Sequence, residues 1–194
     1  NLRKKGCILH DLGRNEDRLR GTYEFPFEFH HIDSSHPRYV MSYHWHVECE
    51  IMRVLQGTLT VTLDEKSFTA KAGDVIFVNS GVLHSGIPQD CIYQCIVFDM
   101  NMFLKFNSVC TEYMQKISHQ ELLIYHHFTE KQPDIQRAVN SLFDSFWQKK
   151  PGYELVVFGQ FYHFFGLVFG NHYYLESLRK TRRDYKRIVQ LKQV

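Results

Sequence analysis

The chain has 194 residues, 44% of them hydrophobic, which is enough for one domain with a sizeable core or one domain plus an appendage. Its five cysteines are an odd number without a C-x-x-C pair, which argues against a disulfide framework and for reduced thiols. The net charge of +2 is uneven: residues 179–194 hold seven Lys and Arg against Asp184 alone, so they carry +6 and the preceding residues −4. This distribution excludes nucleic-acid binding by the main body of the chain.

Membrane insertion and export are also not expected. The basic start of the chain is not followed by the apolar run of a signal peptide. The longest apolar stretch, residues 155–170, is interrupted by Gln160 and His163 and is shorter than the ~20 residues of a spanning helix. We therefore expect a cytoplasmic protein in which this stretch is a buried helix.

The first two thirds of the chain read as a short arm followed by β-structure. Residues 1–20 are polar and contain turn signals, which favours a loosely attached arm. After it, short β-like runs alternate with turns and predict an all-β barrel or sandwich. The expected strands are Tyr23–Ile32, Tyr39–Leu55, Thr58–Leu63, Ser67–Ala70, Asp74–Val78 and Ile92–Phe98.

One of these runs, residues 43–51, carries the most informative pattern of the chain. Side chains alternate between the faces of a strand, so His44, His46, Glu48 and Glu50 are predicted to share one face, with Trp45 on the opposite, apolar face. Imidazole and carboxylate groups are ligands for divalent metals and also hydrogen-bond partners for polar small molecules. The pattern alone leaves both uses open.

Helical periodicity begins after the β-region. Pro133 opens a segment with apolar residues at positions 135, 139, 142, 143 and 146, which predicts a helix ending near Lys150. A second helix, from Tyr153 to about Tyr173, is apolar almost all round and needs cover on more than one side. We therefore expect a homodimer whose interface includes Leu155, Phe158, Phe161, Tyr162, Phe165 and Phe169.

The basic end of the chain has its own helical pattern. Ile188, Leu191 and Val194 lie on one stripe, and no stop signal follows them. The pattern predicts that the natural polypeptide continues beyond this sequence.

Two clusters together resemble the signature motifs of the cupin superfamily, H-x-H-x3-E-x6-G and G-x5-P-x-G-x2-H-x3-N. The first is matched by His44, His46, Glu50 and Gly57. The second is matched by Gly73, Gly81 and His84, whereas Asn79 stands in place of Pro and Pro88 in place of Asn. The resemblance implies a jelly-roll β-barrel whose interior carries His44, His46, Glu50 and His84.

The amino-acid sequence of these motifs and of residues 25–28 also resembles the N-terminal sensor domain of bacterial AraC-type transcription regulators. The resemblance covers roughly residues 20–194 and implies a cupin barrel followed by a helical hairpin. It divides the chain into an arm (1–20), a barrel with an irregular or helical exit (21–130), a dimerising helical pair (131–178), and a basic linker (179–194). That linker is similar to the entry into a helix-turn-helix DNA-binding domain, which is missing from this chain.

Function follows from the resemblance as an expectation. Such a sensor binds a polar effector, for example a sugar, in the barrel and contacts DNA only through its C-terminal domain. His44, His46, Glu50 and His84 are then effector contacts, ligands of one divalent transition metal (Zn, Ni, Fe or Mn), or a structural hydrogen-bonded cluster. We expect no catalytic residues; the alternative is a metal-dependent cupin enzyme of dioxygenase or isomerase type that uses the same four residues.

Overall fold

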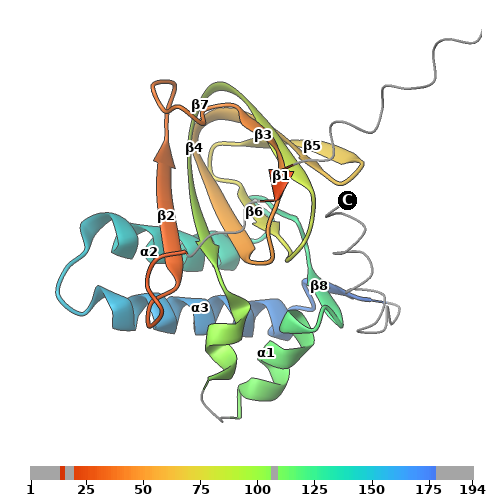
Figure 1. Cartoon of the computed structure of the whole chain (residues 1–194), viewed down its shortest axis with the longest axis vertical. Helices are drawn as coiled ribbons and strands as arrows, with labels where there is room; N and C mark the ends of the chain where they lie inside the picture. The colour runs from red at the N-terminus through yellow and green to blue at the C-terminus, as the bar shows by residue number, and fades with distance from the viewer. Residues whose placement is uncertain (1–13, 16–19, 106–108, 178–194) are drawn as a thin grey trace, which may run out of the picture.

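A computed structural model describes residues 14–15, 20–105 and 109–177. Most of the predicted arm and all of the basic segment 179–194 lie outside these residues. The described chain is mainly β with helices toward its C-terminal end (Figure 1). Its elements are β1 (Arg14–Asn15), β2 (Phe27–Ile32), β3 (Met41–Trp45), β4 (Cys49–Leu63), β5 (Lys66–Lys71), β6 (Val75–Val78), β7 (His84–Phe98), the 3-10 helix η1 (Met100–Leu104), α1 (Thr111–Ser118), β8 (Leu122–Ile124), β9 (His127–Phe128), α2 (Pro133–Gln148), α3 (Tyr153–Gly170) and β10 (Tyr174–Glu176).

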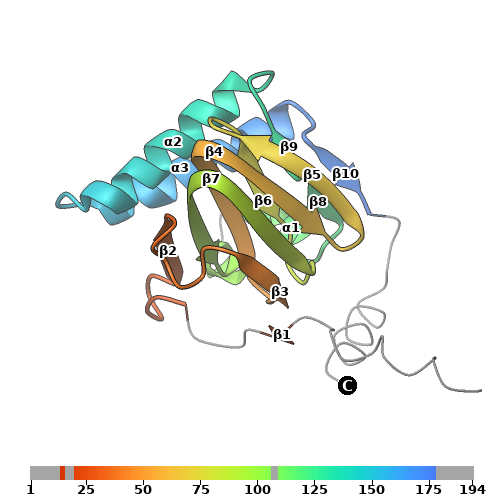
Figure 2. The same cartoon turned by 90° about the horizontal axis from the view of Figure 1, so that it is seen from above.

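Two 15-residue strands, β4 and β7, form the spine of the sheet. They pair antiparallel from Cys49↔Phe98 to Leu63↔His84. Along its length β4 also pairs with β6 and then β5, while β7 pairs with β3 and then β2. Because each long strand changes partner, the sheet bends around a common interior, as Figures 1 and 2 show. The predicted fold class, mainly β with C-terminal helices on a barrel-like sheet, is confirmed.

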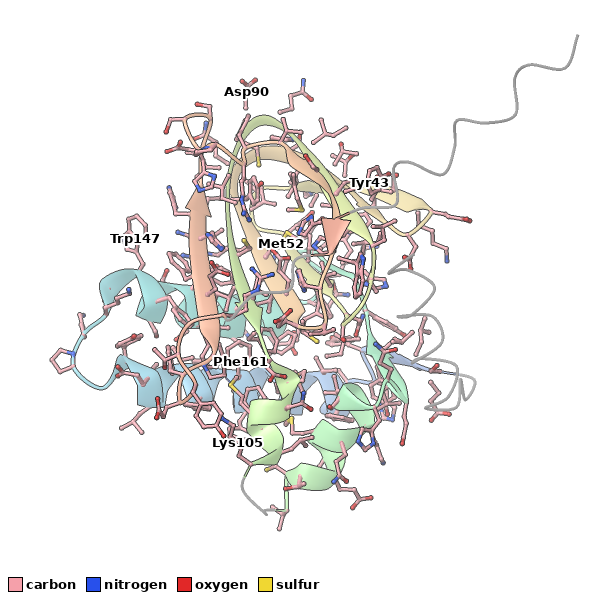
Figure 3. The ribbon with its side chains drawn as sticks, in the orientation of Figure 1. Tyr43, Met52, Asp90, Lys105, Trp147 and Phe161 are labelled. Carbon is pink, nitrogen blue, oxygen red and sulfur yellow. The ribbon has the colours of Figure 1, made fainter. Side chains whose placement is uncertain are left out.

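The sheet buries apolar side chains on both faces. The interior core includes Met52, Val54 and Tyr93, whereas the outer core includes Ile51 and Phe98 and packs on the helices. Figure 3 shows Met52 inside the barrel and Phe161 between the sheet and α3. Before the irregularity around Gly57, strand alternation sends even-numbered residues of β4 into the interior and odd-numbered ones toward the helices; after it, the odd-numbered Leu59, Val61 and Leu63 face the interior.

The sequence prediction placed a turn at Gly57, and this was wrong. Gly57 lies within β4, where the register against β7 shifts between Val54 and Gln56 and again between Gln56 and Thr58. Its φ is +67°, a conformation that favours glycine, and a Cβ there would collide with the backbone of Asp90. Gly57 is therefore a bulge residue that lets one long strand continue through the bend.

Helices α2 and α3 lie side by side across the outer face of the sheet (Figure 2). Helix α2 begins at Pro133, as predicted, and ends at Gln148 because Lys149 adopts a left-handed conformation. Helix α3 ends at Gly170, earlier than expected. No helix among the described residues is long and apolar enough to cross a membrane.

The residues after α3 form a strand that the sequence did not predict. Strand β10 pairs antiparallel with β8, with Tyr174 opposite Ile124. Asn79 holds the other side of β8: its Nδ2 donates to Ile124 O at 2.8 Å, and its Oδ1 accepts from Ile124 N at 3.0 Å. The amide side chain thus imitates a strand neighbour, which explains why Asn rather than Pro serves at this motif position.

Candidate functional site

The four predicted residues converge in the barrel interior. His44 lies on β3, His46 directly follows β3, Glu50 lies on β4, and His84 begins β7. One ligand atom from each lies within 4.8 Å of every other. His46, Glu50 and His84 are at most 3% exposed, so a carboxylate and two imidazoles share a site with little access to bulk water.

The alternation argument predicted that His44, His46 and Glu50 lie on one face of a single strand, but in the structure they do not come from a single strand. The chain leaves strand conformation after Trp45 and resumes it at Cys49. Val47, which alternates with His46 and so falls on the same predicted face as Trp45, is 57% exposed, whereas Trp45 is 2% exposed and belongs to the core as expected. The link between β3 and β4 turns His46 and Glu50 toward the same point from two strands that are separated by β7.

The loop before β7 holds that link in place. Gly81 N donates to His46 O at 2.9 Å, and Ser80 Oγ donates to Val47 O at 2.6 Å. Gly81 has φ +74°, which explains the glycine at this position of the second motif. The second motif therefore supplies His84 and also fixes the loop that carries His46.

Backbone carbonyls set the orientation of the three imidazoles. Nδ1 of His44, His46 and His84 lies 2.8–3.0 Å from the carbonyl oxygens of Ser42, Glu48 and Val82. Carbonyl oxygens only accept, so each Nδ1 carries the proton and donates it. The Nε2 lone pair of each neutral ring is then available to the interior, the arrangement of metal-binding histidines.

With the protons on Nδ1, the Nε2 lone pairs of the imidazoles and the carboxylate of Glu50 face one another without a hydrogen between them. Glu50 Oε2 lies 3.3 Å from His46 Nε2 and 3.2 Å from His84 Nε2. His84 Nε2 is buried and has no partner in hydrogen-bond geometry. Because neutral Nε2 atoms and a carboxylate are all acceptors, the cluster is satisfied only by a positive centre: a proton on an imidazole or a metal cation.

The pKa values show which charges the cluster tolerates. Burial raises the pKa of Glu50, but the proximity of the His46 and His84 imidazoles, either of which can take up a proton, outweighs it and holds this pKa well below its usual value. Burial, with the nearby His84, lowers the pKa of His44 to about 4. Near pH 7 the site therefore presents an ionised carboxylate and a neutral His44, the forms that bind metal.

A divalent transition metal fits these donors. Ligands at about 2.1 Å from one ion are separated by roughly 3 to 4 Å, so a small contraction of the cluster suffices. Three imidazole nitrogens and one carboxylate oxygen suit Zn, Ni, Fe or Mn. When bound, such an ion supplies Lewis acidity and open coordination positions.

Three residues of the cluster, His44, His46 and Glu50, line a cavity of about 250 Å³. Its wall includes apolar side chains from Ile32, Met41 and Val97, and its rim includes Arg38 and Tyr43. A small molecule entering this cavity reaches the imidazoles directly. The arrangement can bind a polar ligand, with or without a metal between ligand and protein.

The model of the AraC-like ligand binding domain matches residues 26–165. This range contains the whole cluster and both long strands. The chain belongs to the AraC-like ligand binding domain family. Membership in this family argues for ligand binding rather than turnover.

Other comparisons cover smaller parts of this AraC-like ligand binding domain. It is 34% identical over 56 residues to the uncharacterized HTH-type transcriptional regulator YdeC of Bacillus subtilis (strain 168), which is 27% of this chain and 19% of that protein. Among solved structures, Bacillus subtilis oxalate decarboxylase is 25% identical, with a TM-score of 0.29 over 31% of this chain and 18% of the other. KdgF from Halomonas sp. is 21% identical, with a TM-score of 0.29 over 30% and 57%.

The AraC-like domain has a polar network beside the cluster that the sequence analysis missed. Arg20 NH1 donates to Glu28 Oε2 at 2.8 Å, and Glu28 Oε1 lies 3.3 Å from His30 Nε2. Glu48 lies between this network and the cluster: its Oε1 is 4.0 Å from Arg20 Nε, and its Oε2 is 3.7 Å from His46 Nδ1. The alternation of Glu28 and His30 on a predicted strand was the available signal.

The outward side of α3 carries part of the predicted dimer interface. Leu155 is 80% exposed and Tyr162 37% exposed, while Phe158 and Phe169 are half-buried. Phe161 and Phe165 were wrongly placed in this interface, because both are fully buried against the sheet of their own chain. The apolar outward face thus depends on fewer residues than expected.

Proposed function

We propose that this domain is the effector-sensing and dimerising part of a cytoplasmic transcription regulator, and that its effector is a polar small molecule bound in the cavity above His44, His46, Glu50 and His84. The observation that carries the proposal is the convergence of these groups, three of which line a cavity, in an AraC-like ligand binding domain. The division into arm (1–20), barrel (21–130), helical pair (131–178) and linker (179–194) belongs to the same proposal.

A divalent metal at the cluster is part of this function. The acceptors crowded around Glu50 Oε2 support it, because a cation removes their mutual repulsion. Metal content is measured by elemental analysis of untagged protein purified without chelator, beside Glu50→Gln and the control His119→Ala, whose imidazole is 58% exposed outside the cluster. We expect near-stoichiometric metal in the wild type and His119→Ala, and a strong loss in Glu50→Gln.

Circular dichroism spectra of the three proteins show whether each is folded. Equal metal content in wild type and Glu50→Gln would contradict the metal site. An effector pocket formed by the imidazoles alone would still stand in that case.

The alternative function is a metal-dependent enzyme that uses the same four residues. One observation favours it: three imidazoles and a carboxylate leave coordination positions open toward the cavity. The two functions differ in whether a ligand is consumed. A ligand that raises the melting temperature and is recovered unchanged after incubation with metal-loaded protein supports the sensor, and conversion of that ligand supports the enzyme.

Dimerisation through α3 completes the proposed role. Leu155, Val156 and Tyr162 expose apolar surface, and a Cβ at Gly159, Gly166 or Gly170 meets nothing within 4 Å, so a second helix can approach closely. Analytical ultracentrifugation compares wild type with Leu155→Asp and with Ile87→Asp, a control at an exposed apolar position on β7. We expect a dimer for wild type and Ile87→Asp, and a monomer for Leu155→Asp; a monomeric wild type contradicts the proposal.

Effector binding is proposed to act on DNA through a domain outside this chain. A ligand shifts an equilibrium only when it binds two states with different affinity. The arm offers one contact, because β1 pairs with β3 so that Arg14 lies opposite His44. We expect residues 1–194 alone to lack sequence-specific DNA affinity in a mobility-shift assay, and such affinity would refute the domain division.

A further inference from the structure

We propose that the effector is a short amphipathic molecule rather than a sugar, with one polar head against the His/Glu cluster (His44, His46, Glu50 and His84) and an apolar tail along the barrel interior. This inference rests on the proposed function, because it assumes that the cavity lined by three residues of this cluster is the effector site. It narrows the ligand from any polar small molecule to one that is polar at one end.

The polarity of the barrel interior falls along the neighbouring strands β2, β7 and β4. The strand pairings align their inward-facing residues in three rows: first Glu28, Val97 and Glu50, second His30, Cys95 and Met52, and third Ile32, Tyr93 and Val54. Arg20 NH1 donates to Glu28 at 2.8 Å, so this cation also lies at the first row. The third row holds no charged side chain and lies roughly 13 Å along the strands from the carboxylates.

Strand β3 and the turn after β2 show what lies between the cluster and the rim of the cavity. His44 on β3 belongs to the cluster, whereas Met41 at the start of β3 lines the cavity and packs on the interior core. The turn that follows Ile32 carries Arg38 to the rim, where this residue is exposed. The cavity therefore has an apolar belt between the cluster and the rim, formed by Ile32, Met41 and Tyr93.

The apolar belt has little hydrogen-bonding capacity to offer a ligand. The Tyr93 hydroxyl donates its hydrogen to Tyr39 O at 3.1 Å, and the other two side chains of the belt are apolar. His30, one row closer to the cluster, has its Nε2 3.3 Å from Glu28 Oε1. A sugar carries hydroxyls all round, and a hydroxyl that is buried against the belt without a partner weakens binding. An apolar tail has no such cost there.

The polar end of the cavity suits a single head group. The cluster presents acceptors to the cavity, namely the Glu50 carboxylate and the Nε2 atoms of His44 and His46. A hydroxyl head donates its hydrogen to one of these acceptors, and its oxygen is a ligand for a metal held by the cluster. The tail is short, because the volume of about 250 Å³ is below the roughly 300–1,000 Å³ of pockets for drug-sized ligands.

The test uses probes that differ in tail length or in the position of their polar groups: 1-butanol, 1-hexanol, 1,6-hexanediol and galactose. Binding of each probe to the full 194-residue chain is measured by calorimetry. Each buried methylene raises affinity about fourfold, so we expect 1-hexanol to bind at least about tenfold more tightly than 1-butanol. The second hydroxyl of 1,6-hexanediol reaches the apolar belt, and we expect it to weaken binding about tenfold relative to 1-hexanol. Galactose is expected to show no saturable binding.

Variants locate the tail. Met41→Gln places an amide in the belt at similar length, Met41→Leu keeps the belt apolar, and Ile87→Gln changes an exposed apolar side chain that does not line the cavity. We expect Met41→Gln to weaken 1-hexanol binding about tenfold, and Met41→Leu and Ile87→Gln to change it less than about twofold. Circular dichroism spectra show whether each variant is folded.

Three outcomes would overturn the amphipathic effector. Galactose or 1,6-hexanediol binding as tightly as 1-hexanol would overturn it and leave the effector pocket intact. Absence of binding by all four probes at millimolar concentration would also overturn it, while metal content and dimerisation still test the proposed function separately. Equal losses in Met41→Gln and Ile87→Gln would show that 1-hexanol binds outside the cavity.

Discussion

Arg53 is a charged side chain that joins the outer face of the sheet to α2, and its replacement tests how that joint is held. Its Nε donates to Gln94 Oε1 at 2.8 Å, and its guanidinium also bonds Asn140 Oδ1 at 3.0 Å and Asp144 Oδ1 at 2.8 Å. The guanidinium carbon lies 5.1 Å from the centre of the Phe143 ring. Arg53→Met removes these polar contacts and keeps much of the apolar stem.

The cost follows from the exposure of each partner. Gln94 is 2% exposed, so the charge-assisted bond to it and the orphaned carbonyl left behind contribute about 2 kcal/mol. The Asp144 side chain is 55% exposed, so that ion pair contributes below about 1 kcal/mol. With the ring contact, the expected loss in the free energy of unfolding is about 3 kcal/mol.

Urea unfolding followed by circular dichroism, at one fixed protein concentration, measures this loss through the midpoint at unchanged m-value. Asp144→Asn is the matched control and is expected to cost less than about 1 kcal/mol. The double variant Arg53→Met/Gln94→Met is expected to be more stable than the sum of the single losses predicts, because it leaves no orphaned carbonyl. If Arg53→Met costs no more than Asp144→Asn, the reasoning from burial is refuted.

Three further predictions concern backbone strain, pH and thiol reactivity. Gly57→Ala is expected to lower the free energy of unfolding by more than about 2 kcal/mol, because its Cβ meets the backbone of β7 at positive φ. Gly159→Ala, on the open side of α3, is expected to stabilise the monomer by about 0.5–1 kcal/mol. Urea unfolding midpoints compare the two variants with wild type. The folded pKa of His44, about 4, lies below its unfolded value of 6.5, so folding excludes a proton and stability falls as pH drops through this window. Urea unfolding at pH 7 and at pH 5 should show a loss of stability that is smaller in His44→Gln than in wild type by about 2 kcal/mol. Burial raises the pKa of the Cys49 thiol to about 12, so this thiol is not ionised at pH 8. Iodoacetamide at pH 8 should therefore label half-buried Cys110 and spare buried Cys49, as measured by mass spectrometry of tryptic peptides. Equal labelling of the two cysteines would contradict this prediction.

The site residues were predictable because each motif places its ligands within a few positions of one another. Alternation pointed to His44, His46 and Glu50, and the resemblance to the cupin motifs added His84. Their path was not predictable, since the departure from strand conformation after Trp45 depends on the loop around Gly81, far away in the sequence. The alternation of residues along one strand does not predict a hydrogen bond to a loop that is distant in the sequence.

Burial on α3 was less predictable than the helix itself. Nearly every position from 153 to 170 is apolar, so periodicity could not separate the inward Phe161 and Phe165 from the outward Leu155. The sheet decides which side is covered. Arg20 was missed for a similar reason, because its partners Glu28 and Glu48 are defined only by the folded barrel.

The amide of Asn79 gives the His44/His46/Glu50/His84 cluster a short hydrogen-bonded link to the last described residues. Two residues after Asn79, Gly81 is bonded to His46, and on its other side Asn79 is bonded to β8, which pairs with β10 near the last described residues. A displacement of His46 by ligand need pass through only one loop and one strand to reach residue 177. Asn79 supplies the side-chain step of this path, so its two hydrogen bonds to Ile124 couple β8 to the loop that is bonded to His46.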